Sequence, residues 1–253
     1  MTHYVLILAG GRGIRLNSKT PKQFLELAGY PMLTHSIRVF NLTHPKSKIY
    51  VSLPNGYKKK WLDLCKKYNF QIPHKVYRGG ERRMDTVYLG LQKILTENSL
   101  MKSDLVSIHD AARPFLDSQF IMKLITCARE RGTAIPVVPL KNSLRRVLKD
   151  SNSPSIIEDR ENFREVQTPQ VFHFSQILAV YNQHYKNINI KSSKLIIKSD
   201  EPSFLDDSSI YQTYLKKGFH PLCFVEGKDY NLKITTSLDY YLAKTIHAFL
   251  NTK

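Results

Sequence analysis

The feature that most constrains the fold of this chain is a regular alternation of short apolar runs with longer amphipathic segments. The apolar runs suit buried strands, and the longer segments carry apolar residues at helical spacing. Strands are predicted at residues 4–8, 48–53, 75–77, 104–108, 134–138 and 219–225. Helices are predicted at residues 31–40, 57–68, 83–95, 118–131, 175–185, 204–217 and 238–250. This order predicts an α/β fold, with a mainly parallel, twisted sheet that carries helices on both faces.

The alternation is interrupted at residues 139–160, where residues 140–148 resemble a β-ribbon and a turn-rich segment follows. We interpret this part as a protruding β-arm that is used in contact between two copies of the chain. A polar, lysine-rich stretch at 187–198 predicts a surface loop. The length of 253 residues fits a single domain, 1–253, that includes the arm.

The charge of the chain bears on its partners. The formal net charge is +17, from 38 Lys and Arg against 21 Asp and Glu, and such an excess favours polyanions. Nucleic acid is one candidate, and a nucleoside triphosphate with a sugar phosphate is another. A nucleic-acid-binding protein would show basic residues interleaved with aromatic residues on one face, or a known module. Neither is found, so we predict no nucleic-acid partner.

The apolar runs and the cysteines indicate the cellular location of the protein. No stretch approaches the roughly 18 apolar residues of a membrane span, and the start lacks the pattern of a signal peptide. The three cysteines, Cys65, Cys127 and Cys223, are far apart and show no Cys-x-x-Cys spacing. This favours reduced, buried thiols over a disulfide framework or a zinc site. We expect a cytoplasmic protein with no membrane partner.

A glycine-rich turn, residues 9–16, follows the first predicted strand. Glycines let the backbone approach a ligand closely, and their N–H groups can face phosphate oxygens. Arg12, Arg15 and the nearby Lys22 add positive charge. No Gly-Lys-Ser/Thr follows, and Leu16 takes the place of the third glycine of the dinucleotide fingerprint, which excludes a P-loop and disfavours a dehydrogenase. The segment therefore predicts nucleotide binding rather than a simple tight turn.

Five ordered segments carry a resemblance to one enzyme family. They are AGGRGIR at 9–15 with PKQFL at 21–25, GGERRMDTV at 79–87, HDAARP at 109–114, QTPQ at 167–170 and NLKIT at 231–235. Together they resemble the 2-C-methyl-D-erythritol 4-phosphate cytidylyltransferase family, whose near relative is the ribitol-5-phosphate cytidylyltransferase family. The resemblance spans nearly the whole chain. It implies a Rossmann-like fold of the nucleotide-diphospho-sugar transferase type.

The resemblance also implies a reaction. The CMP half of CTP would be joined to a phosphorylated polyol with the help of Mg²⁺, and pyrophosphate would leave. Negative charge builds at the α-phosphate during such a transfer, so fixed cations and a metal are the main catalytic groups. The attacking phosphate is already ionised and needs no protein base. His109 is therefore expected to be a packed structural residue.

By the same resemblance, the functional residues fall into three groups. The catalytic residues that contact the triphosphate or orient the acceptor phosphate would be Arg15, Lys22, Arg160 and Lys233. The nucleotide-binding residues would be Ala9, Gly10, Gly11, Gly13, Gly80, Glu81 and Thr86. The acceptor would be bound by Asp110, Arg113 and Ser143, and Asp110 would also hold the Mg²⁺.

Simpler interpretations of these residues remain open. The cations could be ordinary surface charges, and the Thr86 hydroxyl could cap a helix. Asp110 could cap the next helix or pair with Arg113. Arg160 could form an exposed salt bridge with Glu158 or Asp159. A catalytically silent scaffold would be expected to lose Arg15, Lys22 or Lys233, and all are present.

The acceptor and the assembly are less constrained. The family resemblance implies a homodimer whose arm completes either its own site or that of its neighbour. Asn142-Ser143 and Leu205-Asp206-Asp207 depart from the usual family pattern, and Ala9-Gly-Gly is seen in the ribitol relatives. The HDAAR and GGER segments favour 2-C-methyl-D-erythritol 4-phosphate. Ribitol 5-phosphate or another polyol phosphate remains the alternative.

Overall fold

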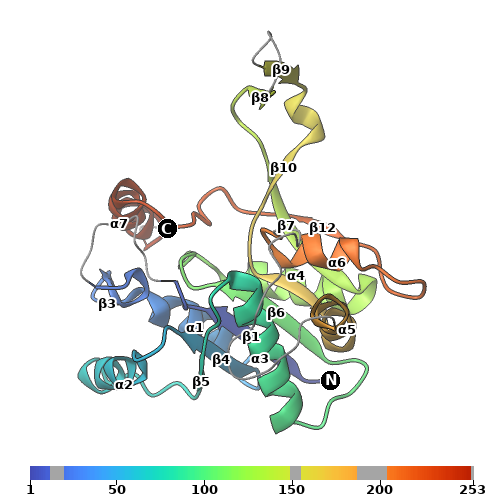
Figure 1. The fold of residues 1–253 in the computed structure, drawn as a ribbon. Coiled ribbons are helices and arrows are strands. Elements are labelled where there is room, and N and C mark those ends of the chain that lie inside the picture. The colour runs from blue at the N-terminus through green and yellow to red at the C-terminus, as the bar shows by residue number, and fades with distance from the viewer. Residues whose placement is uncertain (12–19, 149–154, 187–203, 252–253) are drawn as a thin grey trace.

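The computed structural model describes residues 1–11, 20–148, 155–186 and 204–251 (Figure 1). Within these ranges the main sheet has eight strands, in the order β10-β7-β11-β6-β1-β4-β5, with β12 pairing with β7. The strands are β1 His3–Leu8, β4 Lys48–Leu53, β5 Lys75–Arg78, β6 Leu105–Asp110, β7 Thr133–Pro139, β10 Arg164–Val166, β11 Gln170–His173 and β12 Phe224–Glu226. The pairs β1/β4, β1/β6, β4/β5 and β7/β12 are parallel. Strand β10 pairs antiparallel with β7, and β11 pairs antiparallel with both β6 and β7. The mainly parallel sheet is confirmed.

Helices cover both faces of this sheet. One face is covered by α1 Met32–Thr43, α2 Lys58–Lys67 and α4 Ser118–Arg131, and the other by α3 Arg83–Glu97, α5 Phe174–Tyr185 and α6 Asp207–Thr213. Strand β1 shows why both faces are apolar: Val5 and Ile7 pack in one layer, while Tyr4 and Leu6 pack in the other. All four side chains are buried, as expected for a central parallel strand.

A smaller apolar cluster holds the C-terminal end of the chain. Helix α7, Ser237–Asn251, packs near the short hairpin of β2, Glu26–Leu27, and β3, Tyr30–Pro31. Ala243 of α7 and Ile234 belong to this cluster together with Leu27. The C-terminal part of the chain is thereby packed against a segment near the N-terminus.

The predicted β-arm is present and stands away from the sheet (Figure 1). Its two strands, β8 Leu144–Val147 and β9 Ser155–Glu158, pair antiparallel with each other. The 3-10 turn η3, Arg160–Asn162, and strand β10 lead back to the body. Val147 and Ile157 are 76% and 74% exposed, so the arm carries apolar side chains that the described part of this chain does not cover.

Several predicted boundaries were wrong near the C-terminus. Helix α6 begins only at Asp207, because Asp206 accepts a hydrogen bond from the Ser209 N–H and acts as the N-cap. Strand β12 begins only at Phe224, because the Cys223 N–H donates to the Thr133 side-chain hydroxyl at 2.8 Å rather than to a strand carbonyl, and Pro221 has no N–H to donate. Strands β10 and β11 were not predicted at all. The loop expected at 187–198 lies outside the described residues.

Two further sequence predictions bear on the surroundings of the protein. Within the described ranges, no helix is both long and apolar enough to cross a bilayer. Cys65, Cys127 and Cys223 are free, as predicted, but each is only half-buried. The sulfurs of Cys127 and Cys223 lie 3.3 Å apart and share a hydrogen bond, not a disulfide.

Candidate active site

A cleft opens at the carboxyl ends of β1 and β6, the edge at which open α/β sheets bind ligands. Leu8 and Asp110, the last residues of these two strands, are register partners. The cleft is lined by Leu8, Ala9, Gly10, Gly11, Lys22, Gln23, Gly80, Glu81, Arg82, Arg83, Thr86, Asp110, Ala111, Ala112, Lys233 and Thr235. Most of the predicted site residues are therefore brought together at one place.

The start of the glycine-rich turn is fixed by two hydrogen bonds. The Ala9 N–H donates to the Ser52 hydroxyl over 3.0 Å, and the Gln23 side-chain amide donates to the Ala9 carbonyl over 2.7 Å. A Cβ added to Gly11 would meet nothing within 4 Å, so this residue faces open space. A ligand can approach the backbone there. The predicted residues Gly13 and Arg15, together with Arg12, lie outside the described residues.

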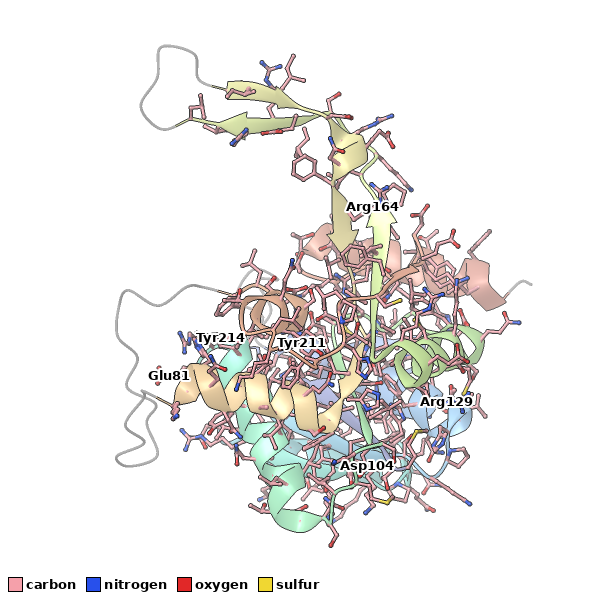
Figure 2. The ribbon with its side chains drawn as sticks, turned by 90° about the vertical axis from the view of Figure 1, so that its right-hand side faces the viewer. Glu81, Asp104, Arg129, Arg164, Tyr211 and Tyr214 are labelled. Atoms are coloured by element: carbon pink, nitrogen blue, oxygen red, sulfur yellow. The ribbon has the colours of Figure 1, made fainter. Side chains whose placement is uncertain are left out.

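The second glycine segment lies beside the first, since a Cβ added to Gly10 would lie 3.9 Å from the Cα of Gly79. The Gly80 N–H donates to the Thr86 hydroxyl over 3.0 Å, and this hydroxyl donates to the Arg82 carbonyl over 3.1 Å. A Cβ on Gly80 would lie 2.4 Å from the Cβ of Asp85, so no side chain fits at this position. Thr86 therefore organises the beginning of α3 and lines the cleft at the same time. The Glu81 side chain is exposed and is labelled in Figure 2.

Asp110 is the central acid of the cleft. Its Oδ1 accepts from Arg83 Nε at 3.1 Å, and its Oδ2 lies 2.6 Å from Lys233 Nζ. Burial alone would raise the pKa of Asp110, but the charges of Arg83 and Lys233 outweigh burial and hold this pKa well below its usual value. The carboxylate is thus ionised and is paired with these two cations rather than with Arg113.

Arg83 and Asp207 are functional candidates that the sequence analysis missed. Arg83 donates through Nη2 to Asp207 Oδ2 at 2.7 Å while its Nε reaches Asp110. Asp207 is fully buried and also accepts from the Tyr181 hydroxyl at 2.6 Å. The only sequence signal was the position of Arg83 inside the GGERRMDTV segment, because Asp207 lies 124 residues away.

Lys22 and Lys233 reach the cleft from opposite ends of the chain. Lys22 follows the glycine-rich turn, and its Nζ donates to the Ile234 carbonyl at 2.9 Å. Lys233 lies on the loop before α7, which is held by Asn231: the Asn231 side-chain amide donates to the Thr168 carbonyl at 2.9 Å. The QTPQ and NLKIT segments thus bind each other and position Lys233.

Three predicted residues do not line this cleft. The Arg113 side chain is buried, and its guanidinium donates to the carbonyls of Asn231, at 2.7 Å, and Val166, at 3.4 Å. Arg113 therefore supports the loop of Lys233 from behind. Ser143 and Arg160 are exposed on the arm.

Arg160 makes its contacts on the arm itself. Its Nη1 donates to the Lys141 carbonyl at 2.8 Å, and its Nε lies 3.4 Å from Glu161 Oε1. The ion pair expected with Glu158 or Asp159 is replaced by this pair with Glu161. Figure 2 shows Arg164 close to the place where the arm joins the body.

His109 is a packed structural residue, as predicted. It is fully buried, and its ring nitrogens contact the hydroxyls of Ser36 and Thr168 and the carbonyl of Arg113. Burial lowers the pKa of His109 to about 4, so the ring is neutral near pH 7. Nothing in this environment equips it as a general base.

The acid groups of the cleft also bear on metal binding. Among the described residues, no group of three or more His, Cys, Asp or Glu side chains could hold an ion. Mg²⁺ is commonly bound through one or two carboxylates together with substrate phosphates and water. One ionised carboxylate, Asp110, stands at the end of β6 among the lining residues. This donor set fits an ion that arrives with a nucleotide.

Comparisons with known proteins give a consistent family. The family model described as 2-C-methyl-D-erythritol 4-phosphate cytidylyltransferase matches residues 3–248. A protein of this name from Porphyromonas gingivalis is 34% identical over 243 residues, which is 96% of both chains. The chloroplastic enzyme of Oryza sativa is 33% identical over 96% of this chain and 73% of its own length.

A solved structure agrees with these sequence comparisons. The 2-C-methyl-D-erythritol 4-phosphate cytidylyltransferase of Francisella tularensis superposes with a TM-score of 0.71 at 26% identity, covering 97% of this chain and 100% of the other. The nucleotide-diphospho-sugar transferase fold expected from the sequence is thereby confirmed.

Proposed function

Because this chain belongs to the 2-C-methyl-D-erythritol 4-phosphate cytidylyltransferase family, we propose that its cleft transfers CMP from CTP to 2-C-methyl-D-erythritol 4-phosphate. Pyrophosphate is the second product, and the reaction belongs to isoprenoid precursor synthesis by the non-mevalonate route. The observation that carries this proposal is the placement of Lys22, Arg83 and Lys233 around Asp110 at the strand ends. Two polyanions must meet here, and fixed cations are the groups that such a transfer requires.

The donor is assigned to the two glycine segments. The open face of Gly11 lets the triphosphate approach the backbone of the turn, and Lys22 stands beside it. Lys22 stabilises the negative charge that builds at the α-phosphate. Arg15 is assigned the same role, although it lies outside the described residues. Gly80, Glu81 and Thr86 form the wall that receives the base and ribose.

The acceptor is assigned to the Lys233 side of the cleft. Lys233 is 41% exposed at its side chain and lies against Asp110, so its ammonium can orient the acceptor phosphate while Asp110 accepts from polyol hydroxyls. The attacking oxygen is ionised already, and this agrees with the neutral, buried state of His109. Protein residues therefore bind and orient, and none needs to remove a proton.

Ser143 and Arg160 join the acceptor site only if an arm reaches a cleft. We propose that they do so in a homodimer. The exposed Val147 and Ile157 of the arm supply apolar area for contact with a second copy. The cytoplasmic location expected from the sequence stays a prediction.

Mg²⁺ is the cofactor that the residues of the cleft fit. Asp110 would hold the ion together with phosphate oxygens of CTP and water. When bound, the ion neutralises part of the triphosphate charge and so favours attack by a second phosphate. The strong depression of the Asp110 pKa keeps this carboxylate ionised for that purpose.

The test is pyrophosphate release by the purified protein with CTP and Mg²⁺. Three parallel reactions contain 2-C-methyl-D-erythritol 4-phosphate, ribitol 5-phosphate or no acceptor. We expect release only with the first compound. Release with ribitol 5-phosphate alone would contradict the proposed acceptor and would assign importance to the departures at Asn142 and Leu205. No release with either acceptor would contradict the proposed function.

A further inference from the structure

A continuous series of hydrogen-bonded groups runs from the protein interior to the cleft. The Tyr181 hydroxyl donates to Asp207 at 2.6 Å, and Arg83 bridges Asp207 and Asp110 at 2.7 and 3.1 Å. Lys233 ends the series, 2.6 Å from Asp110. The charges alternate in sign along it. A buried group on α5 is thus connected to the acid at the centre of the cleft.

The buried carboxylate of Asp207 calls for an explanation. Placing a carboxylate in a fully buried position is costly unless it is paired and hydrogen-bonded. The helix does not need it as a cap, because Asp206 provides the cap of α6 by accepting from the Ser209 N–H. The side chain of Asp207 instead directs both oxygens at Arg83 and Tyr181. Through Arg83, the contacts of Asp207 extend to Asp110 in the cleft.

The effect of Asp207 is exerted on the orientation of Arg83. A guanidinium is a rigid planar fork, so fixing one edge determines where the other donors point. With Nη2 held by Asp207, the Nε of Arg83 is aimed at Asp110 Oδ1. Without Asp207, Arg83 could turn fully onto Asp110 or onto a bound phosphate. The carboxylate of Asp110 would then lose its present position between Arg83 and Lys233.

We propose that Asp207 is a positioning residue for the transfer reaction: it fixes Arg83, and Arg83 in turn fixes Asp110 in the cleft. This inference rests on the proposed function. Asp207 itself touches neither substrate, since it lies outside the residues that line the cleft. Tyr181 supports it from the opposite side.

The test compares Asp207→Asn with Asp207→Glu and with Asp206→Asn. The last variant is a matched control for damage to the start of α6, because it makes the same change one residue earlier, where Asp206 accepts from Gln170, Ser208 and Ser209 and not from Arg83. We expect Asp207→Asn to lower kcat by roughly 10- to 100-fold, as loss of a group that orients a site residue does. The Kd for CTP, measured by calorimetry, should change by less than about threefold, because the cleft cations remain and the loss falls on the transition state. Asp207→Glu keeps the charge and should retain more of the activity. Asp206→Asn weakens hydrogen bonds at the start of α6 without touching Arg83, so it should lose much less activity than Asp207→Asn.

A second variant, Tyr181→Phe, tests the role of Asp207 even if Asp207→Asn does not fold. Tyr181→Phe removes one donor to Asp207 but leaves the pair with Arg83, so its kcat should lie between those of the wild type and Asp207→Asn. A folded Asp207→Asn protein with kcat within about twofold of the wild type would overturn the inference. An equal loss in Asp206→Asn would do the same, since it would indicate general damage to α6. A wild-type protein that releases no pyrophosphate would overturn the proposed function, and the positioning role with it. An active wild type with an equally active Asp207→Asn variant would overturn the positioning role alone, so the two failures can be told apart.

Discussion

Charge balance governs the cleft at the scale of single residues. Four of the lining side chains are cationic, namely Lys22, Arg82, Arg83 and Lys233, and two are acidic, Glu81 and Asp110. Some of this positive charge is neutralised inside the protein, as Arg82 pairs with Asp85 at 3.0 Å. Lys22 donates from its Nζ to the neutral carbonyl of Ile234 at 2.9 Å. Lys22 lines the cleft, where we propose that it stabilises the negative charge that builds at the α-phosphate.

Lys22→Ala should therefore lower turnover by about 10² or more, as removal of a group that stabilises developing charge does. Arg15→Ala should have an effect of the same size. Steady-state pyrophosphate release at saturating CTP measures both. Lys217→Ala is the matched control, since Lys217 is exposed and lies outside the lining residues, and its turnover should be unchanged. Near-normal turnover of Lys22→Ala would remove that residue from the mechanism.

Sequence reasoning located the residues that lie in contiguous motifs and misjudged those whose role depends on distant partners. Lys22, Thr86, Asp110 and Lys233 all line the cleft as expected. The direction of the Arg113 side chain is decided instead by the carbonyls of Val166 and Asn231, far along the chain. Arg83 and Asp207 were missed for the same reason. The local sequence pattern carries no information about contacts between residues that lie far apart along the chain.

At the scale of elements, the arm is the part whose proposed role depends on assembly. Arg160 is exposed and lies outside the cleft of its own chain. We expect Arg160→Ala to raise the KM for the acceptor by about tenfold, with the KM for CTP nearly unchanged, because it contributes a charged contact to the acceptor phosphate alone. Arg164→Ala, at the start of β10 where the arm joins the body, is the control, since Arg164 donates to the carbonyls of Glu161 and Phe163. A raised KM for CTP with an unchanged KM for the acceptor would contradict the assignment.

Mixed dimers decide which cleft the arm serves. Chains with Arg160→Ala can be mixed and re-equilibrated with chains that carry Lys22→Ala. If the arm completes the neighbouring cleft, half of the sites in each mixed dimer are intact, and about a quarter of the activity returns. If the arm serves its own chain, no site is intact, and only the residual activity of the Arg160→Ala sites remains, which is about tenfold lower when the acceptor is well below its KM.

The regular elements were easier to predict than the irregular ones. Helix 118–131 was predicted with the bounds that it has, because Asp117 caps its start and Gly132, at φ +90°, ends it. Strand β11 was missed because it has only four residues, Gln170–His173, and is not separated from α5. Its antiparallel insertion between β6 and β7 depends on the whole sheet, which no local pattern encodes.

At the scale of the whole molecule, buried histidines make the stability sensitive to acid. His3 is buried between the hydroxyls of Ser47 and Ser107, at 2.8 Å each. Burial, and then the charge of His44, lower the pKa of His3 to about 3, against about 6.5 in an unfolded chain. Between these values the unfolded chain binds the proton and the native protein does not. The free energy of unfolding therefore falls as the pH falls from about 6.5 to about 3, by up to a few kcal/mol from this residue.

Urea denaturation at pH 7.5, 6.0 and 5.0 checks this expectation. His3→Asn should be less stable at pH 7.5 but should lose less stability on acidification, because its contribution to proton uptake is gone. His220→Asn, which replaces an exposed histidine, should keep the wild-type slope. An unchanged slope in His3→Asn would show that His3 does not control the acid response.

The hydrogen bond from Lys22 to Ile234 joins positions 212 apart in the sequence. It means that the first and last tenths of the chain must meet before the cleft has both of its lysines. A chain that is still being synthesised can build most of the sheet, yet it holds an unfinished cleft until the final helix leaves the ribosome. A chain that stops after Glu226 and before Lys233 therefore keeps all the strands of the main sheet but lacks the second lysine of the cleft.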